Sequence, residues 1–168
     1  ESIIIPSLNK IGSLWSAGDL FPAQEHFLSN LIKQKLYHIL EERRSKTNIG
    51  KTILLFTPPW ESHDFALIYA DIILQERGVN VCNIGRAFSK EIIYECIENT
   101  KPDYIFTTII VGHKVTEIQE LCDRINSCKT DSKCLLGGNL NLLNFHISNA
   151  HLFNSCKEFE TYVKFQIN

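Results

Sequence analysis

The sequence predicts an α/β fold: a five-stranded, parallel, doubly wound sheet of the flavodoxin-like type, preceded by a partial helical-bundle cap. From residue 51 onward, short apolar segments rich in Ile, Val, Leu and Phe alternate with helical segments. Such alternation at βαβ spacing is typical of a parallel sheet with helices on both faces. The pattern before this point is helical only. We therefore predict two domains, a helical cap over residues 1–48 and a Rossmann-like domain over residues 49–168.

The cap is predicted to consist of two helices. In the first, apolar residues recur at spacings of three and four, which is typical of one buried helix face: Ile4, Leu8, Ile11 and Trp15. The second runs from about Pro22 to Arg44, and its apolar stripe contains Phe27, Leu31, Leu36 and Leu40. Two helices cannot close a bundle alone, so they must pack on other helices, on the next domain or on another chain. The polar segment 45–50 is predicted to be a linker.

The predicted strands of the second domain are short and buried. They cover residues 52–57, 79–84, 103–110, 133–136 and 151–154. The helices are expected to begin near Ser62, Ser89, Val115, Asn139 and Cys156. Parallel sheets of this type bind ligands at the carboxyl ends of their strands, so functional residues should follow directly after strands.

Composition excludes several classes of function. The 168 residues have a net charge of −2, and no run of Lys or Arg is longer than two, so no nucleic-acid-binding surface is expected. No apolar stretch reaches the length of a transmembrane helix. The six cysteines lie mostly in apolar segments without a C-x-x-C pair, which favours reduced thiols and a cytoplasmic location. Because the chain contains no Met, we interpret it as part of a longer protein.

A carboxylate and an imidazole follow the first predicted strand, at Glu61 and His63. A carboxylate that accepts the proton of one ring nitrogen leaves the other nitrogen available as a metal ligand. No second His or Cys lies nearby to complete a zinc site. A single His suits a metal that brings its own equatorial ligands, such as haem or a corrinoid. The alternative is a solvated loop histidine or a helix cap.

The paired glycines Gly137-Gly138 follow the fourth predicted strand. Glycines at this position allow close approach of the backbone to a ligand. The alternative is an ordinary turn between strand and helix.

These features together resemble the signature D-x-H-x-x-G … S-x-L … G-G of corrinoid proteins and cobalamin-dependent mutases. This sequence has Glu61-x-His63-x-x-Ala66, Thr108-x-Ile110 and Gly137-Gly138. The resemblance implies that His63 is the lower axial metal ligand of a cobalamin and that Glu61 orients it. It also implies which residues line the pocket for the nucleotide tail of the cofactor: Thr108, Ile110, Gly137 and Gly138. Glu61 replaces Asp, Thr108 retains the hydroxyl of Ser, and Ala66 adds a methyl group where the signature has Gly.

A second motif lies in the predicted cap, where Trp15 is followed after nine residues by Glu25-His26. This W-x9-E-H pattern resembles the cap of MerR-type transcriptional regulators that sense light through cobalamin, the CarH/LitR class. The resemblance implies that Trp15 covers the upper face of adenosylcobalamin or methylcobalamin, and that Glu25 and His26 bind near the upper ligand. The alternative places Trp15 in a core and Glu25-His26 on an exposed helix face. Ser16 stands where the best-known branch has a His, which argues against a bis-His light state.

The resulting prediction is a cobalamin-binding sensory domain of a MerR-like regulator, responding to light or to the upper ligand of the cobalt. It is not expected to be an enzyme or to contact a membrane. DNA is expected to bind only through an N-terminal domain outside this chain, and a homo-oligomer is possible. Two alternatives stay open: a corrinoid carrier of a methyltransferase system, and a domain that has kept the fold but lost the cofactor.

Overall fold

The computed structural model describes residues 4–110, 114–128, 131–138 and 150–167. It divides into two compact units, Glu1–Glu42 and Arg43–Asn168. The first contains α1 (Ile4–Ser16) and most of α2 (Pro22–Arg43). The predicted apolar stripe of α2 is only partly buried, because Leu36 is buried while Phe27 and Leu31 are exposed. Within the described residues, no helix is long and apolar enough to cross a membrane.

The second unit is a parallel sheet with helices on both faces, which confirms the predicted fold class. Its strands are β1 (Thr52–Thr57), β2 (Asn80–Arg86), β3 (Tyr104–Ile109), β4 (Lys133–Gly138) and β5 (His151–Phe153). Its helices are α3 (Phe65–Glu76), α4 (Lys90–Thr100), α5 (Val115–Ser127) and α6 (Cys156–Gln166). The strand order is β2-β1-β3-β4-β5, and every pair is parallel. The helix predicted near Asn139 lies outside the described residues.

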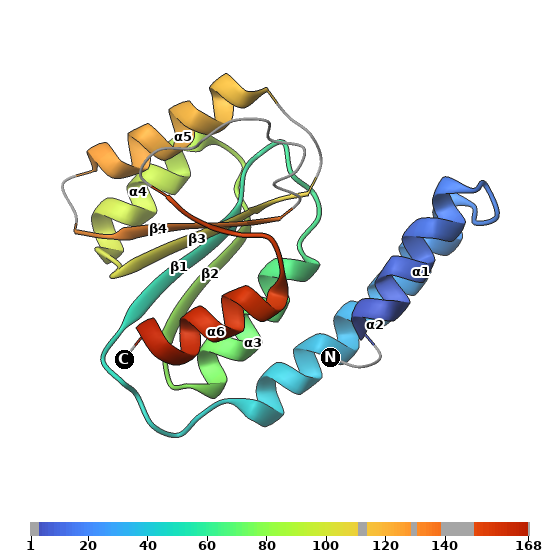
Figure 1. Cartoon of the computed structure of the whole chain (residues 1–168), viewed down its shortest axis with the longest axis horizontal. Coiled ribbons are helices and arrows are strands. Elements are labelled where there is room, and N and C mark those ends of the chain that lie inside the picture. The colour runs from blue at the N-terminus through green and yellow to red at the C-terminus, as the bar shows by residue number, and fades with distance from the viewer. Residues whose placement is uncertain (1–3, 111–113, 129–130, 139–149, 168) are drawn as a thin grey trace. The chain divides into compact units, whose positions relative to one another are not determined.

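Each face of the sheet carries its own apolar core. Helices α3 and α6 cover one face and α4 and α5 the other (Figure 1). Alternate residues of β1 point to opposite faces, so Ile53 and Leu55 join one core while Leu54 and Phe56 join the other. With both faces covered, the strands become nearly continuous apolar runs, which is why they are recognisable in the sequence.

The sequence places the start of α3 three residues too early. We expected it near Ser62, whereas α3 begins at Phe65. The carbonyl of Asp64 accepts the N–H of Ile68 at 3.0 Å, the first bond of the helix. The preceding residues form a loop instead, and this loop holds Glu61 and His63.

An ion pair joins the amino ends of β1 and β3. Asp103 accepts the Thr52 N–H at 2.8 Å and lies 3.0 Å from the Lys51 ammonium. The Thr52 N–H bond, followed by the Lys51 bond and charge, lowers the pKa of Asp103 below its ordinary value of 3.8. A carboxyl group with a lowered pKa stabilises the fold above its unfolded-state pKa, and this stability disappears as the pH falls through the folded-state pKa.

We therefore expect the Asp103→Asn variant to be less stable than the wild type at pH 7 by less than about 1 kcal/mol, because the pair is partly exposed. Urea unfolding should show this difference shrinking below pH 3.8. A difference that is the same at pH 7 and pH 3 would show that the charge of Asp103 does not stabilise this edge.

Candidate cofactor site

The loop between β1 and α3 is held in place from two sides. The Glu61 N–H donates to the Pro58 carbonyl at 2.9 Å, and the Thr57 hydroxyl donates to the Glu61 carbonyl at 3.1 Å. From the end of β2, the Arg86 guanidinium donates two hydrogen bonds to the Pro59 carbonyl, at 3.1 and 2.7 Å. These bonds fix the backbone of the loop at the carboxyl edge of the sheet.

Glu61 connects this loop to the end of β3. Its side chain is 1% exposed. One carboxylate oxygen accepts the His63 N–H at 2.9 Å and lies 2.6 Å from the His63 Nδ1. The other accepts the Ile110 N–H at 2.7 Å. Strands β1 and β3 are neighbours where the strand order reverses, which is where doubly wound sheets bind their ligands.

The carboxylate also determines which nitrogen of His63 is available. A carboxylate only accepts, so the ring proton is assigned to Nδ1 and the lone pair to Nε2. The side chain of His63 is 51% exposed, and its ring hydrogen bond among the described residues is at Nδ1. The structure therefore brings Glu61 and His63 together as predicted, and the Nε2 lone pair is not used by the contact with Glu61.

Replacing Glu61 with glutamine tests how firmly the carboxylate is held. Glutamine has one oxygen where Glu61 uses two as acceptors, so its amide group must face a donor. We expect Glu61→Gln to lower the free energy of unfolding by about 1–3 kcal/mol. The matched control is Glu158→Gln, since the exposed Glu158 accepts one backbone N–H, from Asn154 at 2.7 Å. If urea unfolding shows equal losses in the free energy of unfolding for the two variants, the buried carboxylate of Glu61 is held no more firmly than the exposed one of Glu158.

Thr108 and the paired glycines lie side by side in the sheet. Thr108 in β3 pairs with Gly137 in β4, and Ile109 pairs with Gly138. The Thr108 hydroxyl is buried and has no hydrogen-bond partner among the described residues. A polar atom of a ligand would satisfy it. Ile110, the other predicted residue of the tail pocket, is half-buried and donates its N–H to Glu61.

Both glycines also have a structural reason to be glycine. A Cβ on Gly138 would lie 2.0 Å from the carbonyl oxygen of Ile109, and its φ of +131° is strained for other residues. A Cβ on Gly137 would lie 3.2 Å from the ring of Phe106. The paired glycines thus allow close packing of β4 against β3, whether or not a ligand also approaches them.

The residues predicted to lie at the upper face of the cofactor belong to the helical unit. Trp15 lies in the last turn of α1, and Glu25 and His26 lie in the first turns of α2. The Glu25 carboxylate accepts the Ser29 hydroxyl at 2.5 Å and lies 3.2 Å from the His26 Nδ1. Glu25 and His26 are therefore close to each other, and their role toward a cofactor stays a prediction.

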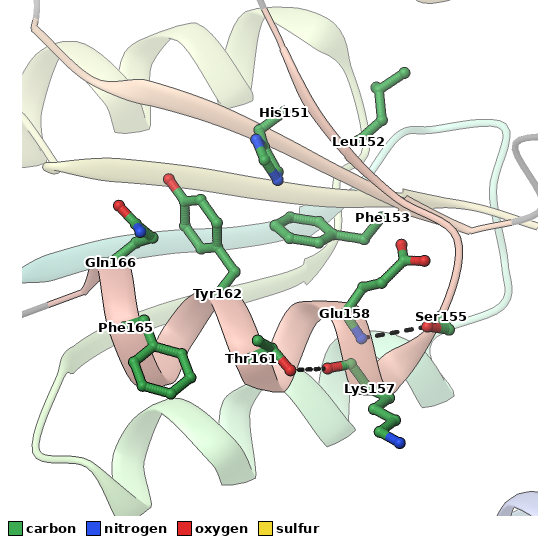
Figure 2. A pocket seen from close by; sticks show the side chains of 10 residues that line it. All are labelled: His151, Leu152, Phe153, Ser155, Lys157, Glu158, Thr161, Tyr162, Phe165 and Gln166. Carbon is green, nitrogen blue, oxygen red and sulfur yellow. Dashed lines mark hydrogen bonds between the residues drawn. The ribbon is translucent and has the colours of Figure 1, made fainter.

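A surface pocket of about 670 Å³ lies elsewhere, between β5 and α6. Figure 2 shows the rings of His151, Phe153 and Tyr162 lining it. None of the residues predicted to bind a cofactor lines this pocket. Its position on the edge strand separates it from the Glu61–His63 pair at the end of β1.

Sequence reasoning missed three residues around the site. Arg86 is the last residue of β2, at the ligand edge of the sheet, but only the structure shows that it holds the loop. Thr107 is buried with an unpartnered hydroxyl on the face opposite Thr108, among the described residues. Phe106 appears in the sequence as an ordinary core residue, and only the packing shows that it fills the space beside Gly137.

Comparison with known proteins finds one family model and one curated relative that resemble this chain. A family model described as a B12 binding domain matches residues 1–40. The HTH-type transcriptional repressor CarH of Myxococcus xanthus is 22% identical over 125 residues, 74% of this chain. The resemblance to cobalamin-binding domains of MerR-type regulators is confirmed. The chain spans 41% of the length of that repressor.

Solved structures share the fold of this chain. The monomethylamine corrinoid protein of Methanosarcina barkeri superposes with a TM-score of 0.75 at 15% identity, covering 98% of this chain and 80% of its own. A cobalamin-binding protein of Desulfitobacterium hafniense DCB-2 has a TM-score of 0.57 at 17% identity, covering 93% of this chain and 76% of its own. At these identities the likeness shows the shared fold.

The residues present fit a corrinoid. His63 offers one imidazole nitrogen, and the buried Thr108 hydroxyl lacks a partner among the described residues. In the part of the chain that the structure describes, no three His, Cys, Asp or Glu side chains converge on a possible metal position. A single ligand suits a metal that already has its equatorial nitrogens. The donor set of the site thus agrees with the match of residues 1–40 to a B12 binding domain.

Proposed function

We propose that this chain is the cobalamin-binding sensory domain of a MerR-like transcriptional regulator and that it has no enzymatic activity. The observation that carries the proposal is the Glu61–His63–Ile110 arrangement at the strand-order reversal, in which Glu61 binds Nδ1 of a half-exposed His63 and leaves its Nε2 available. The similarity to the repressor CarH supports a regulatory role over a catalytic one. DNA binding through a domain outside this chain and self-association are parts of the same proposal.

In this proposal each predicted residue has a distinct task. His63 holds the metal of the cofactor from below, and Glu61 fixes the tautomer and orientation of the ring. Thr108 would donate or accept a hydrogen bond with the tail of the ligand at the carboxyl edge of the sheet, where β4 ends in Gly137 and Gly138. When bound, the cofactor would supply a metal–carbon bond that light can break, and the proposed signal is either light or the identity of the upper ligand. Trp15, Glu25 and His26 are proposed to respond to the group on the upper side of the metal.

One experiment tests the proposal as a whole. The protein is mixed in the dark with adenosyl-, methyl- or hydroxocobalamin, freed of unbound ligand, and its visible spectrum and oligomer size are recorded before and after green light. We expect retained corrin absorbance and a light-dependent change of spectrum and size. Loss of all corrin absorbance on removal of free ligand would contradict cofactor binding and favour a domain that has kept only the fold.

The second candidate function is a corrinoid carrier of a methyltransferase system. Its support is the fold shared with the monomethylamine corrinoid protein and with the MtaBC methanol:cobalamin methyltransferase complex of Methanosarcina barkeri, which has a TM-score of 0.57 at 14% identity. The same experiment separates the candidates. A carrier retains methylcobalamin but shows no light-dependent change of oligomer size.

A further inference from the structure

The side chain of Phe106 occupies the space that Gly137 leaves beside Thr108. Phe106 and Thr108 are two residues apart in β3 and therefore point to the same face of the sheet. A Cβ on Gly137 would lie 3.2 and 3.3 Å from two ring carbons of Phe106 and 3.6 Å from the Thr108 methyl group. The ring is 3% exposed. The space beside the glycine is thus already filled by an aromatic ring of the same chain.

The ring is held from behind by aromatic neighbours. Its centroid lies 4.6 Å from that of Phe159 in α6 and 6.5 Å from that of Phe153 in β5, and both neighbours are buried. The helices over this face are joined as well, since the Tyr69 hydroxyl of α3 donates to the Glu160 carboxylate of α6. Withdrawing Phe106 would break aromatic contacts that are each worth about 0.5–1.5 kcal/mol beyond their buried area.

On this face of β3, a polar side chain lies at the carboxyl edge of the sheet and an apolar ring lies directly behind it. The Thr108 hydroxyl, nearer the carboxyl edge, is buried without a hydrogen-bond partner among the described residues. Phe106 lies about 6.6 Å deeper, two strand residues along. A ligand that reaches Thr108 satisfies its hydroxyl, whereas a ligand that extends further meets the ring of Phe106.

We propose that Phe106 is a specificity-determining residue that limits how deep the lower tail of a corrinoid can enter, so that this chain prefers corrinoids lacking the nucleotide tail. The ligand class is that of the cobinamides, whose side chain ends in an amide-linked alcohol instead of a bulky nucleotide. The inference rests on the proposed function, because it concerns the pocket below His63. The inference adds that the ring of Phe106 closes the pocket below His63, so that the pocket ends at the level of Thr108.

The test compares two ligands with three proteins. Dissociation constants for diaquacobinamide and hydroxocobalamin are measured by visible titration for the wild type, Phe106→Leu and Phe106→Ala. We expect the wild type to bind diaquacobinamide more tightly than hydroxocobalamin. We expect Phe106→Ala to shift the ratio of the two constants toward hydroxocobalamin by about tenfold or more, because the truncation opens a cavity beside Gly137. Phe106→Leu should shift the ratio in the same direction by a smaller factor.

Thermal unfolding without ligand shows whether each variant is folded. If Phe106→Ala is unfolded, the better-tolerated Phe106→Leu variant carries the comparison. An unchanged ratio in the folded variants, or tighter binding of hydroxocobalamin by the wild type, would overturn the role of Phe106 alone. Failure of the wild type to retain either corrinoid would instead contradict the proposed function, and this inference with it.

Discussion

The His63→Ala variant is expected to lose the axial nitrogen ligand and to bind hydroxocobalamin at least about tenfold more weakly than the wild type. The physical reason is that Glu61 fixes the ring through a 2.6 Å contact to Nδ1, so the wild type offers Nε2 in a ready orientation. Any corrinoid that the variant still binds should show the spectrum of the free ligand. Visible titration of both proteins measures the two effects together.

His38→Ala is the matched control for this prediction. His38 is also exposed and also pairs with a glutamate, its Nε2 lying 3.3 Å from Glu42. It lies in α2 and belongs to the helical unit, not to the α/β unit that contains Glu61 and His63. Its replacement should leave the affinity and the spectrum unchanged. The ligand assignment of His63 is wrong if both variants bind with the affinity and spectrum of the wild type.

The Gly138→Ala variant is expected to be among the most destabilised single substitutions in the α/β unit. Its Cβ would lie 2.0 Å from the Ile109 carbonyl oxygen, and the conformation at φ +131° is strained for alanine. Since the contact is with backbone of the neighbouring strand, no side chain can move away to relieve it. We expect a loss of at least about 3 kcal/mol in the free energy of unfolding, measured in urea.

Gly137→Ala provides the comparison within the same strand. Its φ is not in the strained region, and its nearest neighbour is the Phe106 ring at 3.2 Å, which needs to move by only a few tenths of an ångström. The loss for Gly137→Ala should therefore be clearly smaller than for Gly138→Ala. Equal losses would show that the close approach of Gly138 to β3 is not what requires glycine there.

Most of the fold can be predicted from the sequence because its signals are local. The buried strands are short apolar runs, and the starts of α4, α5 and α6 fall within one residue of their predicted positions. The start of α3 was predicted too early. The reason is that the loop before it is held by side chains distant in sequence, such as Arg86.

The site could be predicted in part. Glu61 and His63 are two residues apart, so their contact follows from local geometry. The bond from Ile110 to Glu61 joins residues 49 positions apart and depends on β1 and β3 being neighbours. The role of Phe106 depends on packing between β3, β4 and α6, which local sequence patterns do not reveal.

The most direct test of the account is to identify the atom beneath the cobalt. The protein is labelled with ¹⁵N only at histidine, loaded with hydroxocobalamin, reduced to the cobalt(II) state, and its electron paramagnetic resonance spectrum is recorded. If Nε2 of His63 is the axial ligand, each cobalt line is split into a doublet by ¹⁵N, and His63→Ala loses that doublet. A triplet from ¹⁴N in the labelled protein would show that the cofactor keeps its own base, and would contradict the role assigned to His63.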